Sequence, residues 1–138
     1  MTVTLVDNGA QSGYCKVHLE GDATVAGLLG QIANPEGVLL QIVEGWIYFT
    51  AGATAAATQN IGIAASGVDN AALLSGFAMN AAAGTVWNIV ARGAAEAAAT
   101  GAQTGVLWPA ASFLTVTNAA AASTDLDADI FLKYIRLA

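Results

Sequence analysis

The sequence predicts an all-β protein: a single-domain β-sandwich with jelly-roll or Greek-key connections and an extended N-terminal arm. Short runs of alternating apolar and polar residues recur along the chain, and turns rich in Gly, Asn and Asp separate them. Counting the runs gives about seven or eight strands, which suits a sandwich. The length of 138 residues suits one domain. We therefore expect residues 1–13 to form an arm or edge strand and residues 14–138 to form the sandwich.

The strongest strand signal begins after Pro35 and Gly37. Residues 38–50 are mostly β-branched, aromatic or leucine, a composition typical of a strand that is covered on both faces. The small residues 51–53 allow the chain to reverse direction, because Gly and Ala restrict a turn little. Residues 59–64 are therefore predicted to return as the second strand of a central β-hairpin.

The N-terminal part offers one clear strand and two ambiguous segments. Residues 14–20 alternate like a half-exposed strand. Residues 1–13 suit an edge strand or an arm that orders only against a neighbour, and we favour the arm. Residues 23–33 have apolar residues at helical spacing, but Gly27 and Gly30 each weaken a helix by about 1 kcal/mol, so a covering loop is an equal alternative. In the clear strand Cys15, Val17 and Leu19 oppose Lys16, His18 and Glu20.

Short elements are predicted in the middle of the chain. Asp69 is a candidate N-cap for a single helical turn that ends at Leu74. Phe77 and Met79 are expected to anchor a loop that crosses between the sheets. Residues 85–91 alternate again, which predicts another strand.

The C-terminal part combines a long insertion with three strand-like segments. Residues 92–105 are mostly Gly, Ala, Thr and Gln, which predicts a surface excursion. Residues 106–108 return to the core, and Pro109 ends that segment or marks a sheet edge. Residues 113–118 alternate as a strand. Residues 128–137 are apolar on both faces, so we expect a strand that is central in its sheet or covered by another subunit.

The composition points to a surface poor in charge. Hydrophobic residues make up 56% of the chain and charged residues only 10%, against typical values of about 45–50% and about 25%. We infer that partner subunits cover part of this surface, because large apolar patches mark interfaces. The net charge is −6, and the cations are scattered, so we expect no direct nucleic-acid binding. The four cations are Lys16, Arg92, Lys133 and Arg136.

Membrane insertion and secretion are not expected either. Polar residues interrupt every apolar run before it reaches the roughly 18 residues that a membrane helix needs. The first residues lack the basic region and long apolar core of a signal peptide. We expect a chain that is made in the cytoplasm and remains soluble until it assembles.

The sequence provides no catalytic, cofactor or metal site that we would assign. The acidic residues Asp125, Asp127 and Asp129 alternate like a calcium loop, but the EF-hand pattern then requires a glycine and a glutamate where Ile130 and Arg136 stand. We therefore expect carboxylates that face water. His18 lacks partners at the spacing of a triad or a zinc site, so we interpret it as an exposed strand histidine. Cys15 is the only cysteine, which excludes an intramolecular disulfide.

The tryptophans allow two interpretations. Trp46, Trp87 and Trp108 each lie in an apolar, strand-like run. An indole in such a run more often fills the core, with its N–H paired locally. The alternative is a set of aromatic platforms for sugars, as in a lectin, and we favour the core.

Four phrases together resemble a group of small Ala/Gly-rich β-proteins from tailed bacteriophage virions. They are Val-His-Leu-Glu-Gly-Asp-Ala-Thr (17–24), Ile-Ala-Asn-Pro-Glu-Gly-Val (32–38), the Gly-Ala-Thr-Ala-Ala-Ala-Thr and Asn-Ile-Gly-Ile-Ala-Ala-Ser pair within 52–66, and Ala-Asp-Ile-Phe-Leu-Lys-Tyr-Ile (128–135). These phrases encode turns and strands rather than chemistry. The group is generally regarded as virion structural proteins, in particular head or capsid-associated ones.

The resemblance implies a capsid decoration, or cement, protein without enzymatic activity. Such a protein would bind the outside of the head, bridge major capsid subunits and form homo-oligomers, with trimers favoured. Alternatives are a head fibre base, a minor capsid or tail protein, or a glycan-binding adhesion module. We expect residues 1–10 and 92–105 to make contacts in the assembled virion.

Overall fold

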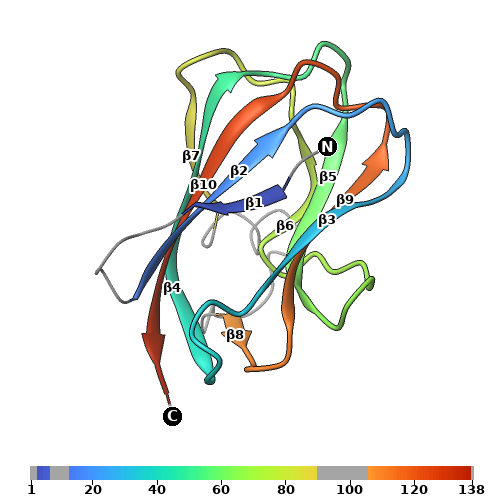
Figure 1. Cartoon of the computed structure of the whole chain (residues 1–138). Helices are drawn as coiled ribbons and strands as arrows, with labels where there is room; N and C mark the ends of the chain where they lie inside the picture. The colour runs from blue at the N-terminus through green and yellow to red at the C-terminus, as the bar shows by residue number, and fades with distance from the viewer. Residues whose placement is uncertain (1–2, 7–12, 90–105, 138) are drawn as a thin grey trace.

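The computed structural model describes residues 3–6, 13–89 and 106–137. In these residues the chain forms ten strands, arranged as two antiparallel sheets that pack face to face (Figure 1). The predicted all-β, single-domain β-sandwich is confirmed. Residues 92–105, predicted as a surface excursion, lie outside the described residues.

Sheet A forms one layer and sheet B the other. Sheet A contains, in spatial order, β1 (Val3–Val6), β2 (Tyr14–Glu20), β10 (Asp127–Arg136), β4 (Leu40–Ala51) and β7 (Val86–Asn88), and β8 (Val106–Trp108) also pairs with β4. Sheet B contains β3 (Gly27–Ala33), β9 (Phe113–Ala120), β5 (Thr58–Ala64) and β6 (Leu74–Ala78). Because β10 already occupies one side of β4, both β7 and β8 pair along its other side.

The strand order is that of a jelly roll. Strand β2 pairs with β10, β3 with β9, β4 with β7 and β5 with β6, so the pairs are nested from the outside inward. A long hairpin that rolls up into two facing sheets gives this order. Of the two predicted wirings, the jelly roll is therefore the one that the chain adopts.

Strand β10 lies in the centre of sheet A. This is one of the two environments predicted for residues 128–137, the other being a cover by another subunit. It pairs with β2 on one side and with β4 on the other. Its inward face, which includes Ile130, Leu132 and Tyr134, is buried. On its outer face Ile135 is 45% exposed. The apolar residues on that face are therefore not covered within the described chain.

The predicted central hairpin is wrong. Strands β4 and β5 lie in different sheets, and each pairs with other strands. Residues 52–57 cross between the sheets instead of turning back, and Ala53 and Ala57 pack into the core on the way. Ala53 N–H also donates to the carbonyl of Met79. Small residues suit a close crossover as well as a tight turn, so local composition could not distinguish the two.

Strand β4 is covered on one face only, which corrects the prediction for residues 38–50. Its side chains alternate between the core and the outside. Ile42, Ile47 and Phe49 are buried, whereas Tyr48 is 39% exposed. A β-bulge opposite the Lys133–Tyr134 step of β10 inserts one extra residue, Val43, which also faces outward.

Strand β3 replaces the predicted helix or loop over residues 23–33. Its residues pair with β9, with a register shift between Leu28 and Gly30. The apolar residues at helical spacing do not share one buried face, because Val25 is 62% and Leu28 43% exposed while Ile32 is buried. Long-range pairing with β9 has overridden the local pattern.

Two shorter elements also differ from their predictions. No helical turn follows Asp69, and β6 begins where that turn was expected to end. Phe77 lies in strand β6 rather than in a loop, although it is buried, as is Met79, which follows the strand. Strand β7 covers only three residues of the predicted range 85–91, of which residues 90–91 lie outside the described part.

The N-terminal segment contributes an edge strand. Strand β1 pairs antiparallel with β2 and also contacts β3 of sheet B. Of the two alternatives for residues 1–13, the described part is thus a strand, while residues 1–2 and 7–12 lie outside it.

The core fills the space between the two sheets. Strand β2 supplies Cys15, Val17 and Leu19, as predicted, and all three are fully buried. The largest fully buried side chains are Trp108, Phe49, Leu19, Leu40, Ile42, Ile47, Ile61, Leu73, Leu74, Met79, Ile89 and Leu114. These inward faces leave the outer face of sheet A to carry polar, aromatic and aliphatic side chains.

Candidate functional site

The strand register places side chains of different chemistry in rows across the outer face of sheet A. In one row His18 stands opposite Asp129, which stands opposite Tyr48. In the next row Lys16 stands opposite Phe131, which stands opposite Trp46. A third row holds Tyr14, Lys133 and Glu44, and a fourth holds Ile135, Gln41 and Leu107. This face therefore passes from charged through aromatic to aliphatic.

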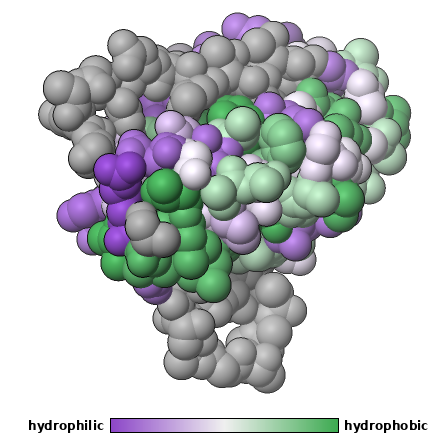
Figure 2. Space-filling view, turned by 60° about the horizontal axis from the view of Figure 1, so that its bottom comes forward, coloured by the Kyte–Doolittle hydropathy of each residue, from purple (hydrophilic) through white to green (hydrophobic). Residues whose placement is uncertain are grey.

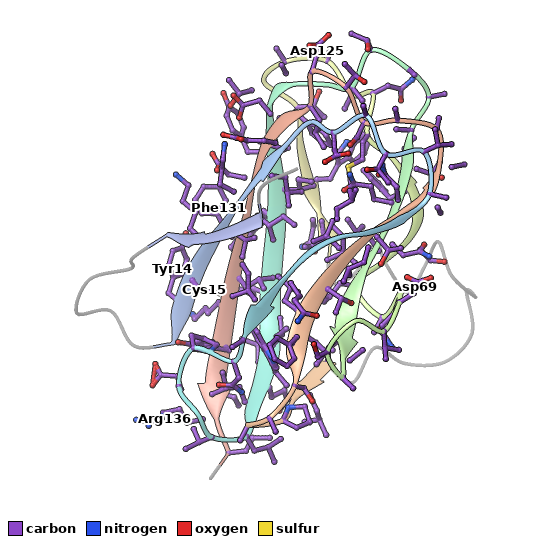
Figure 3. All side chains as sticks on the ribbon, turned by 45° about the vertical axis from the view of Figure 1, so that its right-hand side comes forward. Tyr14, Cys15, Asp69, Asp125, Phe131 and Arg136 are labelled. Carbon is purple, nitrogen blue, oxygen red and sulfur yellow. The ribbon has the colours of Figure 1, made fainter. Side chains whose placement is uncertain are left out.

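Five residues in the middle of this face line a shallow, open hollow of about 520 Å³. We call it the aromatic hollow; its lining residues are Tyr14, Trp46, Tyr48, Val86 and Phe131. They come from strands β2, β4, β7 and β10. Figure 3 shows Tyr14 and Phe131 beside each other on the side of sheet A that faces away from sheet B. Four of the five lining side chains are aromatic, and the surface that they present is largely apolar.

The rings of Tyr14 and Phe131 in the aromatic hollow are tilted against each other rather than stacked. The ring centroids of Tyr14 and Phe131 lie 6.4 Å apart, with their planes tilted by 40°. Lys16 Nζ lies 5.7 Å from the centre of the Phe131 ring, within the range of a cation–π contact. Tyr48 is 39% and Val86 56% exposed, so this part of the hollow is open to solvent.

The three tryptophans have different environments: Trp108 lies in the core as predicted, Trp87 packs against the core, and Trp46 lies outside it. Trp108 is fully buried, and its Nε1–H donates to the carbonyl of Ser112 at 3.1 Å. Trp87 is half-buried and packs edge-on against Phe77, with ring centroids 6.1 Å apart. Trp46 is also half-buried, but it lies on the outer face in the aromatic hollow. For Trp46 the prediction of a core position is wrong, because β4 alternates and residue 46 falls on its outer side.

One end of the molecule carries a separate aliphatic surface. Val43, Leu107, Ile135 and Leu137 are 36%, 53%, 45% and 46% exposed, and we call them the aliphatic end patch. They lie on β4, on β8 and at the end of β10, which meet at the bottom of Figure 1. Figure 2 looks toward this end, where hydrophobic residues gather on the surface. Glu44 and Lys133, directly opposite each other, stand in the same row as Tyr14, between this patch and the other residues of the aromatic hollow.

A network of charges occupies the opposite end of the same face. His18 Nδ1 lies 2.8 Å from Asp129 Oδ1, and its Nε2 lies 3.5 Å from Glu20 and 3.7 Å from Asp127. Lys16 Nζ lies 3.7 Å from the other oxygen of Asp129. The hydrogen bond that His18 donates to Asp129 raises the pKa of His18 above 6.5; partial burial opposes this shift, and the charges of Asp129, Asp127 and Glu20 add to it.

This network corrects part of the prediction for the acidic residues. Asp125 is exposed in the turn before β10, as predicted. Asp129 is only 16% exposed, because His18 and Lys16 cover it. His18 itself is 29% exposed, so it is a paired strand histidine rather than a freely exposed one. Its two nitrogens face different carboxylates, and the described residues contain no group of three or more His, Cys, Asp or Glu placed to hold a metal ion.

The remaining titratable core groups are held away from the surface chemistry. Cys15 lies on the inward face of β2, and burial raises the pKa of its thiol to about 12. Burial, together with a hydrogen bond to Glu36 at 3.0 Å, raises the pKa of Tyr134 to about 12.

In the described part of the chain, no helix is long and apolar enough to cross a membrane.

The turn after β3 fixes the aliphatic end. Asn34 is buried, and its Nδ2 lies 2.9 Å from the carbonyls of Val38 and Trp108 and 3.2 Å from that of Pro109. Its Oδ1 accepts the backbone N–H groups of Glu36 and Gly37, both at 2.9 Å. One amide thus joins the turn to the end of β8, next to Leu107.

Comparison with protein-family models, curated proteins and solved structures finds no match. The functional argument therefore depends on the surface itself. Sequence reasoning did not find the aromatic hollow, but it contained a usable signal. In each of two alternating strands an aromatic residue stands on the polar face: Tyr14 beside Lys16 in β2, and Phe131 between Asp129 and Lys133 in β10. An aromatic ring on the polar side of a strand indicates an exposed contact.

Proposed function

We propose that the chain is a non-enzymatic virion structural protein: a capsid decoration protein that binds the outer surface of a phage head and bridges major capsid subunits. The observation that carries this proposal is the aliphatic end patch. Single exposed apolar residues are ordinary, but a group of them at one end of a molecule marks a contact surface. In this patch Leu107 of β8 and Ile135 of β10 both stand opposite Gln41 of β4. Only one strand therefore lies between these two exposed side chains.

The patch has the chemistry of a docking surface that does not depend on charge. Arg136, at its rim, lies 3.5 Å from Glu36, and Lys133 stands opposite Glu44. Arg136 is therefore paired with a carboxylate, and Lys133 has an acidic residue directly opposite it in the neighbouring strand. A partner with a complementary apolar surface would gain mainly from the removal of aliphatic groups from water.

The fold suits a mechanical role, and because a jelly roll supports many functions, the surface carries the argument. Two sheets with a continuous core give a stiff body, and its aliphatic end joins strands β4, β8 and β10. A bridge that binds only the expanded head stabilises that state by mass action and requires no catalysis. Self-association, with trimers favoured, is part of the proposal, because three copies could engage neighbouring capsid subunits together.

The described titratable groups also support a role without catalysis. The nucleophile Cys15 and the base His18 belong to the same strand but to opposite faces. Burial raises the pKa of the thiol, and the imidazole is engaged by carboxylates on the outer face. These two groups therefore do not form a nucleophile–base pair.

The test measures binding of the purified chain to heads of its own phage, in both expanded and unexpanded forms. We expect saturable binding to expanded heads, with many copies spread over each particle. Leu107→Asp should lower the affinity by at least about tenfold, because it places a charge in the apolar contact. Val25→Asp is the matched control: Val25 is 62% exposed but lies before β3, in the other sheet.

Two results would reject the proposal. One is a wild-type chain that binds neither form of the head. The other is an L107D variant that stays folded and binds expanded heads as well as the wild type. A few copies per particle at one vertex would instead indicate a fibre base, minor capsid or tail component.

A further inference from the structure

We infer that the aromatic hollow is a binding site for neutral saccharides, which would be a second activity beyond capsid decoration. The site consists of Tyr14, Trp46, Tyr48, Val86 and Phe131 on the outer face of sheet A. Tyr14 stands in the same row as Lys133 and Glu44, and that row separates the other lining residues from the aliphatic end patch. A chain docked through its aliphatic end would therefore not need these rings for docking.

The size and composition of the hollow suit a small ring-shaped ligand. Its volume of about 520 Å³ lies within the range of small-molecule sites, about 300–1,000 Å³. Five lining residues are far fewer than the roughly 20–30 residues that one side of a stable protein–protein interface uses. The apolar C–H face of a pyranose can pack on an aromatic ring, while its hydroxyl groups stay at the edge.

The rim supplies partners for those hydroxyl groups. The phenol groups of Tyr14 and Tyr48 belong to the lining itself. Lys16 lies over Phe131 with its side chain 37% exposed, so its ammonium group is at the edge of the hollow. Apolar rings with a few polar groups around them are the usual composition of a ligand site.

The charges around the hollow favour a neutral ligand over a charged one. Glu20, Asp127 and Asp129 lie at one end of the face, and the chain carries a net charge of −6, which disfavours acidic sugars. Lys16 already lies over the face of Phe131 and would repel a cationic side chain. A neutral hexose-containing saccharide avoids both penalties.

The experiment applies the full-length chain to an array of neutral oligosaccharides, with galactose, glucose or mannose at their ends, and of sialylated oligosaccharides. Hits are then titrated in solution by calorimetry. We expect binding to a subset of the neutral glycans. Trp46→Ala should weaken that binding at least about tenfold, in the range of a central contact residue. Val25→Ala should leave it unchanged, because Val25 is exposed and lies just before β3 of the other sheet.

Thermal unfolding of each variant separates lost binding from lost structure. Tyr48→Ala provides a second variant if Trp46→Ala does not fold, since Tyr48 is 39% exposed and contributes little to the core. Failure of the wild type to bind any neutral glycan would overturn the inference, as would binding restricted to sialylated glycans. Undiminished glycan binding by folded W46A and Y48A would overturn it too. A requirement for Trp46 in head binding would identify the hollow as a capsid contact and also overturn the inference.

Discussion

Replacing Asn34 by alanine tests whether one buried amide holds the aliphatic end together. The Asn34 side chain donates to carbonyls of Val38, Trp108 and Pro109 and accepts the N–H groups of Glu36 and Gly37. Two N–H groups of the amide serve the three carbonyls, so one of these contacts is shared. The variant loses the four or so hydrogen bonds that this amide can make at one time.

The expected loss of stability depends on how many of the backbone groups that lose Asn34 as a partner remain inaccessible to water. Each typical hydrogen bond contributes about 1 kcal/mol net, and a buried group left without a partner costs about 1–3 kcal/mol. The N–H groups of Glu36 and Gly37 can reach water, because Gly37 is exposed and Glu36 half-buried. The carbonyl of Trp108, in contrast, belongs to a buried residue, so water does not readily replace the lost Asn34 N–H group. We therefore expect a decrease of about 3 kcal/mol in the free energy of unfolding, which corresponds to a lowering of Tm by about 10 °C for a chain of this size.

Urea unfolding followed by tryptophan fluorescence, together with calorimetry, measures this decrease. The matched control is Asn80→Ala, which removes an exposed asparagine and should change stability by less than about 0.5 kcal/mol. Asn34→Asp keeps an acceptor for the two N–H groups but turns a carboxylate oxygen toward the carbonyls, so it should be at least as destabilising near neutral pH. If N34A unfolds within about 0.5 kcal/mol of the wild type, the buried amide does not hold the turn as argued.

Three further predictions concern single groups. The pKa of His18 is raised above 6.5 in the folded chain. The stabilisation from protonated His18 is therefore complete below pH 6.5 and is lost as the pH rises through the pKa of the folded state. NMR titration of this histidine should show the raised pKa, and His18→Gln should flatten the pH dependence of stability. Cys15 should resist thiol reagents at neutral pH in the native chain and react fully in urea, because burial raises its pKa to about 12; rapid native labelling would contradict this. Gly62→Ala should cost about 1–3 kcal/mol in urea unfolding, since its Cβ would lie 2.0 Å from Asn70 Oδ1 and 2.8 Å from the nitrogen of Ala72; unchanged stability would show that this loop can move aside.

Individual strands could be predicted from the sequence where a single face is buried. Residues 14–20 alternate because one side of the strand packs into the core and the other does not. No strand was predicted for residues 27–33, because this segment contains glycines and has apolar residues at helical spacing. Pairing with β9 makes it a strand. The pairing partners themselves were out of reach, because β10 joins β2 and β4 across more than half of the chain.

The candidate sites were harder to predict than the strands for the same reason. The aromatic hollow combines Tyr14, Trp46 and Phe131, which only the order β2-β10-β4 brings together. The charge network depends on the same order, since His18 meets Asp129 only when β2 lies beside β10. Residues 127–136 form strand β10, and sequence spacing could not show that Asp129 would be the covered carboxylate of this segment.

The pairing of charges changes what the shortage of charge means for binding. Each described lysine or arginine stands beside a carboxylate: Lys16 at Asp129, Arg136 at Glu36, and Lys133 opposite Glu44. A polyanion that approached Lys16 or Arg136 would have to displace a paired carboxylate, so phosphate binding would cost more than the count of cations suggests. Apolar contacts pay no such penalty, and salt does not screen them. Binding through the aliphatic end patch should therefore persist as ionic strength rises, whereas a contact made through the His18 network should weaken. Comparing head binding in dilute and concentrated salt would thus identify which end of sheet A makes the proposed capsid contact.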